Sequence, residues 1–358
     1  MKKLLLILLG VTLAGGVAGV LLMGRGETTP PTGPPVEILI PPGATFDAVV
    51  DTLEARGLVG TPRIFKAYGR LKGADREIRS GPYSLVPGTP WSEILYDLTT
   101  GRVLTETLVI PEGFRLAQMA PRISAVTELE ADTVLARLTA DSADVEWGVP
   151  GPGLEGYLFP DSYRVAQGAP LSDVLRAMVD RYRLFWTQER EAARDALGMT
   201  EAEVVTLASI VQAEARATGE MPIIASVYHN RLDRGQLLQA DPTVLYALGG
   251  FRARLLYAAM DSVAEHPYNT YTYPGLPPGP IGAPGETALD ATLYPAETAF
   301  FYFVARPDGT HVFSETLAEH NRAVAELRPD WERYRREQAL CAAGDSREES
   351  NRFRSERR

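Results

Sequence analysis

Glu214 is a single carboxyl near the end of the almost wholly apolar segment 206–215. With about 3.6 residues per helical turn, it shares a face with Leu207, Ile210 and Val211. A glutamate on an apolar face must be paired, held neutral or face a cleft. Desolvation raises the pKa of such a carboxyl, and a proton retained near neutral pH suits a general acid. The residues alone leave open a structural ion pair with Arg216 or Arg231.

Other chemistries find less support in the sequence. The four histidines lack paired ligand spacing, and a lone surface histidine is usually solvated. Ser209 lies within the predicted helix and not on the strand-to-helix turn of a nucleophilic serine. No lysine follows Lys72, which excludes Schiff-base chemistry with pyridoxal phosphate in the second half. The single cysteine, Cys341, excludes a disulfide framework and a cysteine-based metal site, so we expect no cofactor.

Cleavage of a glycosidic bond fits a protonated glutamate in a cleft. Ordinary glycosidases use a second carboxyl, yet Asp241 and Glu155 are predicted on separate elements from Glu214. One carboxyl is enough if the sugar supplies its own nucleophiles. An N-acetyl oxygen can stabilise the anomeric centre and a 6-hydroxyl can close on it, with the glutamate acting first as acid and then as base.

Two loops have the composition of a ligand cleft. Segment 151–163 is rich in aromatic residues and contains Glu155 and Asp161, which favours either a sugar cleft or a packed interdomain hinge. Segment 268–281 begins with three tyrosines and continues with prolines and glycines. A long loop inside a compact domain is usually functional, and this one offers hydroxyl, amide and aromatic groups to a polar ring-shaped ligand.

The elements around these loops can also be predicted. We expect one amphipathic helix over 171–197 and a second over 221–233, closed by Gly235, with Asn230 and Arg231 able to reach the cleft. Asp241 is expected mainly as the N-cap of a short helix. A hairpin over 300–313 follows, and then a helix whose capping box includes Glu319. After residue 327 the charged tail is expected to be helical and then disordered.

The N-terminal third reads as an anchor and a small module. Residues 4–23 are uncharged and long enough to span a bilayer, with Lys2 and Lys3 favouring a cytoplasmic N-terminus. A cleaved signal peptide is the alternative. A Pro/Thr/Gly-rich linker over 24–35 follows, and then a strand–helix–helix–strand pattern whose helices begin at Thr61-Pro62 and Thr89-Pro90. Such a module suits glycan binding or a simple spacer.

From the membrane segment to about Leu327, the chain resembles the MltG-type (YceG-like) endolytic murein transglycosylases. The resemblance rests on LEGYLFPDSY (154–163), LASIVQAEA (207–215), ASVYHNRL (225–232), LQADPTVLY (238–246), YNTY (268–271) and GLPPGPI (275–281). It implies an α+β protein with a transmembrane helix, a LysM-like module and a mixed α/β catalytic domain. It also implies cleavage of nascent peptidoglycan between MurNAc and GlcNAc, leaving 1,6-anhydroMurNAc ends, with Glu214 as the essential residue.

These expectations define an organisation and a site. We expect a cytoplasmic tail over 1–3, a transmembrane helix over 4–23, a linker over 24–35, a LysM-like module over 36–105, a catalytic domain over 106–327 and a charged tail over 328–358. The catalytic residue is Glu214, and substrate contacts are expected from Ser209, Asn230, Gln239, Asp241, Tyr268, Asn269, Thr270 and Glu155.

The resemblance further implies an inner-membrane protein whose catalytic part lies outside the cytoplasm. Its partners would be glycan strands, the membrane and peptidoglycan synthases. Nucleic acid is not expected, because the net charge is −10 and no basic stripe is visible in the sequence. Two rival hypotheses remain: a non-catalytic peptidoglycan-binding scaffold for the synthases, and a true hydrolase.

Overall fold

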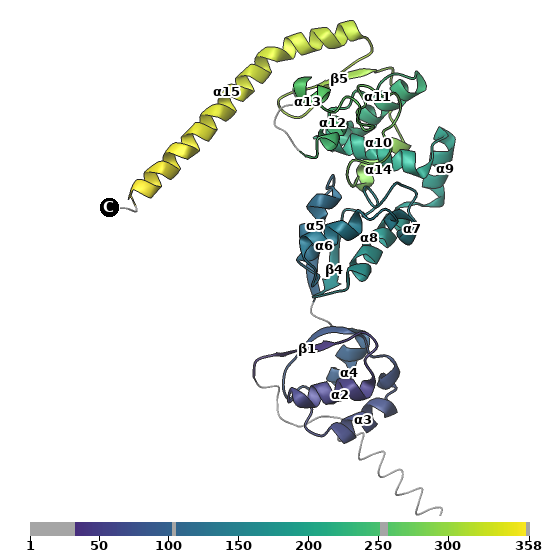
Figure 1. Ribbon diagram of the computed structural model, residues 1–358, viewed down its shortest axis with the longest axis vertical. Coiled ribbons are helices and arrows are strands. Elements are labelled where there is room, and N and C mark those ends of the chain that lie inside the picture. Colours follow the sequence, from purple (N-terminus) through teal and green to yellow (C-terminus); the bar gives the residue numbers. More distant parts are fainter. Residues whose placement is uncertain (1–32, 102–104, 251–256, 356–358) are drawn as a thin grey trace, which may run out of the picture. The chain divides into compact units, whose positions relative to one another are not determined.

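The computed structural model describes residues 33–101, 105–250 and 257–355 (Figure 1). Within these ranges, helices combine with three two-stranded sheets, which confirms the expectation of a mixed α/β protein. The predicted membrane anchor, residues 4–23, lies outside the described residues. In the part that is described, no helix is both long and apolar enough to cross a membrane.

The chain divides into two compact units. The first contains the described residues up to Leu108 together with Arg122–Ala131 and Ser162–Val174. The second contains Val109–Pro121, Asp132–Asp161 and the described residues from Leu175 onward.

The N-terminal part of the first unit has the predicted strand–helix–helix–strand order. Strand β1 (Val36–Ile40) pairs antiparallel with β2 (Gly81–Leu85), and α2 (Phe46–Ala55), α3 (Pro62–Leu71) and the 3-10 turn η1 (Ala74–Arg76) lie between them in sequence. Helix α4 (Trp91–Thr100) follows β2 and ends at Gly101, in the left-handed conformation. Its N-cap is Pro90, so the predicted start at Thr89-Pro90 is one residue early. The core includes Ile38, Leu53, Phe65, Tyr83 and Leu98.

Short elements connect this module to the rest of the chain. Strand β3 (Thr105–Val109) pairs with β4 (Ser162–Ala166), and α5 (Leu116–Ser124), α6 (Ala131–Leu138) and α7 (Ala143–Trp147) lie between them in sequence. The sequence pattern over 128–139 predicts one helix, and the structure has the shorter α6.

The single helix predicted over 171–197 is wrong. The structure has two helices, α8 (Leu171–Phe185) and α9 (Gln188–Leu197), with Trp186 and Thr187 between them. The Thr187 hydroxyl accepts a hydrogen bond from the backbone N–H of Arg190 and so caps α9. Gly198 ends α9 in the left-handed conformation.

Helix α10 (Glu201–Glu214) lies at the centre of the second unit. A capping box formed by Thr200 and Glu203 starts it. Every residue from Val204 to Val211 is buried, because α11 (Met221–Asp233), α12 (Asp241–Ala247) and α14 (Glu286–Leu293) all pack against the helix. Burial on all sides is broader than the predicted single apolar face. The last residue of α10, Glu214, lies where the helix leaves this core.

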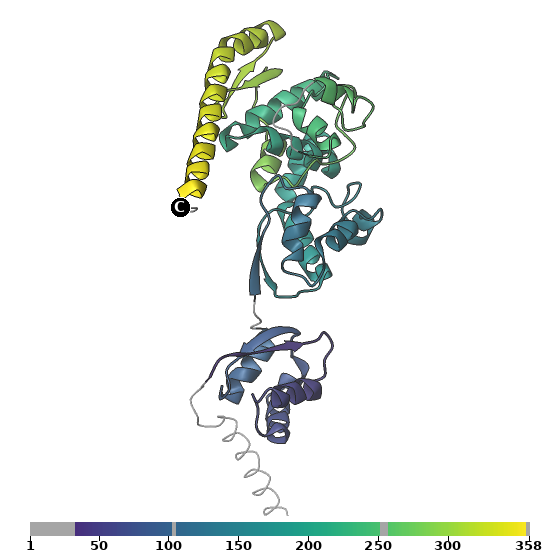
Figure 2. The same ribbon diagram turned by 60° about the vertical axis from the view of Figure 1, so that its left-hand side comes forward.

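A hairpin and a long helix complete the unit (Figure 2). The predicted hairpin is confirmed as β5 (Tyr302–Ala305) paired with β6 (His311–Ser314). Thr316 and Glu319 form the predicted capping interaction at the start of α15 (Leu317–Ser355). This helix continues through the charged tail as far as Ser355. The indole N–H of Trp331 donates to the carbonyl of Ala305 and attaches α15 to the hairpin. The short helix α13 (Tyr257–Asp261) precedes the tyrosine-rich loop.

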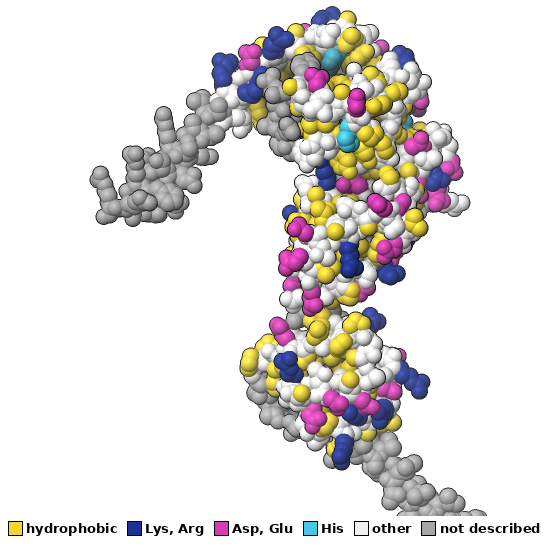
Figure 3. Space-filling view, viewed as in Figure 1, with side chains coloured by type: hydrophobic (Ala, Val, Ile, Leu, Met, Phe, Trp, Pro, Cys, Tyr) yellow, Lys and Arg dark blue, Asp and Glu magenta, His cyan; other side chains and the backbone are white. Residues whose placement is uncertain are grey.

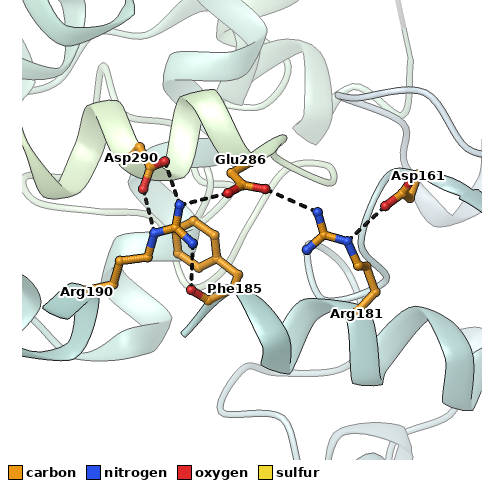
Figure 4. A network of polar contacts seen from close by, with 6 residues as sticks. All are labelled: Asp161, Arg181, Phe185, Arg190, Glu286 and Asp290. Carbon is orange, nitrogen blue, oxygen red and sulfur yellow. Dashed lines mark hydrogen bonds and ion pairs between the residues drawn. The ribbon is translucent and has the colours of Figure 1, made fainter. Parts of the chain in front are cut away.

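Charged side chains of both signs are interspersed over the face in Figure 3, and one set forms the ion-pair network of Figure 4. Arg190 of α9 contacts Asp290 and Glu286 of α14, both at 2.8 Å. Arg181 of α8 contacts Glu286 at 3.1 Å and Asp161 at 2.9 Å. These pairs connect α8 and α9 to α14, which packs against the helix that carries Glu214.

We expect Glu286→Gln to lower the free energy of unfolding by about 1 kcal/mol near neutral pH, since two partly exposed ion pairs are lost. Hydrogen bonds from Arg190 and then Arg181 hold the pKa of Glu286 below its ordinary value of 4.5. Its stabilising contribution is therefore present above about pH 4.5 and lost as the pH falls through the depressed pKa. Urea unfolding at pH 7 and pH 3 should show the difference between variant and wild type shrinking in acid. An equal loss of unfolding free energy at pH 7 and pH 3 would contradict the stabilising role assigned to the Glu286 ion pairs. The control is Glu297→Gln, at an exposed glutamate just past α14.

Candidate active site

Glu214 lines a cavity of about 330 Å³ in the second unit. Helix α11 contributes Tyr228 and Arg231, and the segment before α12 contributes Gln239. The remaining wall comes from Asp241, Tyr271, the β5–β6 hairpin and the start of α15. The cavity therefore gathers carboxyl, hydroxyl, amide and aromatic groups around one glutamate, which suits a polar ligand with rings.

The surroundings of the Glu214 carboxyl favour its protonated form. Burial raises its pKa to about 7; a hydrogen bond from Tyr228 opposes the shift, the negative charge of Asp241 adds to it, and the positive charge of Arg231 opposes it. The Tyr228 hydroxyl donates to Glu214 Oε1 at 2.9 Å and fixes the orientation of the carboxyl. A carboxyl whose pKa is raised toward neutral pH can both give and take a proton in that range.

Arg231 is not the ion-pair partner that the residues alone left open. Its Nε donates to the carbonyl of Phe301 at 2.7 Å and its Nη1 to the carbonyl of Leu238 at 2.6 Å. The guanidinium also lies over the ring of Tyr302, 5.3 Å from the centroid. Arg231 thus joins the hairpin to the segment before α12, and both of these form walls of the cavity.

Asp241 and Gln239 lie in the cavity with Glu214, as a shared site requires. The expectation that Asp241 caps α12 is wrong: the N-cap is Ala240, and Asp241 Oδ1 instead accepts a hydrogen bond from the Tyr271 hydroxyl at 2.6 Å. Gln239 has a φ of 50°, and it is the only non-glycine residue with a positive φ among those described. Such a conformation is costly and often occurs at functional sites.

Four other predicted contact residues hold the surrounding loops instead of lining the cavity. Ser209 donates to the carbonyl of Thr206 and accepts from the backbone N–H of Ile281, which attaches the proline-rich loop to α10. The side-chain amide of Asn230 donates to the carbonyls of Thr298 and Phe300.

The tyrosine-rich loop is held in the same way. Thr270 Oγ1 accepts from the backbone N–H of Ala240 at 3.0 Å, and Asn269 Oδ1 accepts from the backbone N–H of Tyr271 at 3.0 Å. Both side chains are buried. They place Tyr271 and the start of α12, where Asp241 lies, at the cavity wall.

Glu155 and Tyr268 belong to a second cluster outside the cavity lining. Glu155 Oε1 accepts from the backbone N–H of Leu116 at 3.2 Å, at the first residue of α5, and burial raises its pKa to about 7. Arg115 lies over the ring of Tyr246, whose centroid is 4.8 Å from that of Tyr268. Glu155 therefore accepts a hydrogen bond at the N-terminus of α5 and does not line the Glu214 cavity.

Sequence reasoning missed the part that Tyr228, Tyr271 and His311 play in the cavity. His311 is only 6% exposed and is paired with Glu220, so the interpretation as a solvated surface histidine is wrong for this residue. Ninety-one positions separate Glu220 from His311, and no local spacing could reveal the pair. Across the described ranges, no three His, Cys, Asp or Glu side chains gather closely enough to hold a metal ion.

Known proteins are similar to this chain over most of its length. The model of the YceG-like family matches residues 38–326. An endolytic murein transglycosylase of Bacillus subtilis (strain 168) is 32% identical over 306 residues, covering 80% of this chain and 83% of the relative. One of Streptococcus pneumoniae (strain R6) is 28% identical, and the match covers 81% of this chain but 58% of that longer protein. A crystal structure of a YceG-like protein from Listeria monocytogenes is 30% identical, with a TM-score of 0.56, covering 82% of this chain and all of that one.

Proposed function

The chain belongs to the YceG-like family, and we propose that it is an endolytic murein transglycosylase with Glu214 as its acid/base residue. The observation that carries the proposal is the half-buried Glu214 carboxyl beside Tyr228 in a polar and aromatic cavity, where desolvation raises its pKa to about 7. A scaffold that only binds glycan has no need of such a group, which favours an enzyme over the rival hypothesis.

The reaction is cleavage of a peptidoglycan strand between MurNAc and GlcNAc without water. The protonated Glu214 gives its proton to the glycosidic oxygen as the bond to the anomeric carbon breaks, and the N-acetyl oxygen of the MurNAc stabilises that carbon. The 6-hydroxyl then bonds to the anomeric carbon and returns its proton to the Glu214 carboxylate. The product ends in 1,6-anhydroMurNAc, and the enzyme regains its starting protonation state.

The environment of Glu214 suits both half-reactions. Burial favours the neutral acid before cleavage, whereas the Tyr228 hydroxyl and the nearby positive charge of Arg231 favour the carboxylate formed afterwards. Asp241 and Gln239 are the predicted substrate contacts that share the cavity with Glu214.

The remaining parts of the chain have roles consistent with this reaction. Residues 4–23 anchor the protein in the inner membrane with the catalytic part outside the cytoplasm, and the module over 36–105 is LysM-like and binds glycan. Peptidoglycan synthases are the partners that would supply nascent strands. The resemblance to the family and the uncharged N-terminal segment support these assignments.

The pH profile of kcat/KM tests the role of Glu214, because it reports the pKa of the free enzyme's essential acid. We expect activity to fall about tenfold per unit above pH 7. In Tyr228→Phe the hydrogen bond that favours the carboxylate is lost, so this alkaline limb should move to higher pH. In Asp241→Asn a repelling charge is lost, so the limb should move to lower pH.

The opposite signs of these two shifts make the test specific. Strands of purified peptidoglycan are the substrate, and soluble fragments are quantified at each pH. If both variants shift the limb in the same direction, or neither shifts it, Glu214 is not the titrating acid.

A further inference from the structure

Glu220 pairs with His311, a residue that lines the Glu214 cavity. Glu220 ends the 3-10 turn η2 (Thr218–Glu220), which follows α10, and His311 is the first residue of β6. Glu220 Oε2 lies 2.8 Å from His311 Nδ1, and Oε1 accepts the backbone N–H of the same residue at 3.2 Å. One carboxylate therefore fixes both the backbone and the ring of His311.

This arrangement determines which nitrogen of the ring is available. A carboxylate can only accept, so Nδ1 carries the hydrogen, and in the neutral ring Nε2 is the acceptor. The ring lines the cavity, and Nε2 has no hydrogen-bond partner within the described part of the chain. Nε2 is thus the polar atom that His311 can offer to an occupant of the cavity.

A purely structural role explains the pair poorly. The His311 ring packs against Phe303 at 5.3 Å and Phe313 at 6.0 Å between centroids, surroundings that an apolar side chain would suit. Placing a carboxylate and an imidazole beside these rings costs desolvation energy. Phe303 in turn packs edge-on against Tyr228, the residue that orients Glu214, so contacts between aromatic rings link His311 to the acid.

We propose that His311 contacts the substrate and that Glu220 is its positioning residue. His311 Nε2 accepts a hydrogen bond from a donor on the glycan, an acetamido N–H or a hydroxyl. This inference rests on the proposed function, because it assumes that the cavity binds glycan, and it adds two residues that the family resemblance did not assign.

Glu220→Gln tests whether Glu220 sets the tautomer of the His311 ring, and it removes no atom from the cavity wall. The glutamine oxygen can take the backbone N–H of His311, which turns the amide NH₂ toward Nδ1. The hydrogen then moves to Nε2, and the cavity faces a donor in place of an acceptor. Binding of linear, uncross-linked glycan strands should weaken about tenfold or more, as expected for one lost hydrogen bond with an unsatisfied donor left behind.

Binding is measured calorimetrically in the Glu214→Gln background, where strands are not cleaved. His311→Leu should weaken strand binding at least as much as Glu220→Gln does. His311→Gln places an amide near the Nε2 position, so it should bind strands more tightly than His311→Leu. His229→Gln is the matched control, because the His229 ring bonds to the backbone carbonyl of Thr292 and does not line the cavity. Its binding should equal that of the parent.

Nitrogen NMR of His311 provides a readout that needs no variant at that position. At a pH where the ring is neutral, the free protein should show the Nδ1–H tautomer, and saturating strands should shift the Nε2 resonance. An unchanged resonance, or undiminished binding by folded Glu220→Gln, overturns the proposal. Failure of the Glu214→Gln parent to bind strands would instead refute the proposed function, on which the inference depends.

Discussion

Replacing Glu214 with glutamine is expected to reduce the release of soluble fragments from peptidoglycan by about 10³-fold, within the range usual for a lost general acid. Glutamine keeps the shape of the side chain and an oxygen that can accept the hydrogen bond from Tyr228, but it has no proton to give. Initial rates on purified peptidoglycan at pH 6 to 7 measure the effect. Glu297→Gln, at an exposed glutamate outside the cavity lining, should retain full activity.

The same variant separates lost chemistry from lost folding. Since burial raises the pKa of Glu214 above its ordinary value of 4.5, the folded state binds more protons than the unfolded state between about pH 4.5 and 7. The contribution of this residue to stability therefore falls as the pH rises through that range. Glu214→Gln should be at least as stable as the wild type at pH 8. An inactive variant that is also much less stable there would leave burial, and not catalysis, as the role of Glu214.

Arg231→Met is expected to cause the largest loss of stability, about 3 to 5 kcal/mol, because buried carbonyls are left without donors. Arg231 is 8% exposed and donates to the carbonyls of Phe301, Leu238 and Leu237. Methionine fills a similar volume but supplies no donor. The free energy of unfolding from urea titration gives the direct measure.

Arg231→Lys provides the graded control. Lysine keeps the positive charge but not the fork that reaches the hairpin and the segment before α12 together, so its loss should be intermediate. If the methionine variant unfolds at the same urea concentration as the wild type, Arg231 does not hold the two cavity walls in place.

Local signals in the sequence predicted much of the fold. Thr61-Pro62 starts α3, Thr316 caps α15, and the turn 306–309 joins β5 to β6, because each depends on residues close together in the chain. The break between α8 and α9 was missed because the apolar periodicity continues through Thr187, whose hydroxyl caps the second helix. A helix cap that lies within a continuous apolar periodicity can be recognised only from its hydrogen bond in the structure.

The site could be predicted only in part. Glu214 stood out because a lone carboxyl in an apolar helix is energetically unusual. Ser209 and Thr270 instead bond to backbone groups of neighbouring loops, which are the nearest partners for short hydroxyls. The Glu220–His311 pair joins a turn and a strand far apart in sequence, and it depends on tertiary structure alone.

The most direct test of the central claim is digestion of purified peptidoglycan in water labelled with ¹⁸O, followed by mass spectrometry of the released fragments. A transglycosylase closes the 6-hydroxyl on the anomeric carbon, so we predict fragments one water lighter than reducing-end fragments and free of ¹⁸O. Glu214→Gln should release almost none of them. Reducing ends that carry ¹⁸O would show a hydrolase, and anhydro-ended fragments released equally by Glu214→Gln would contradict the role assigned to this residue.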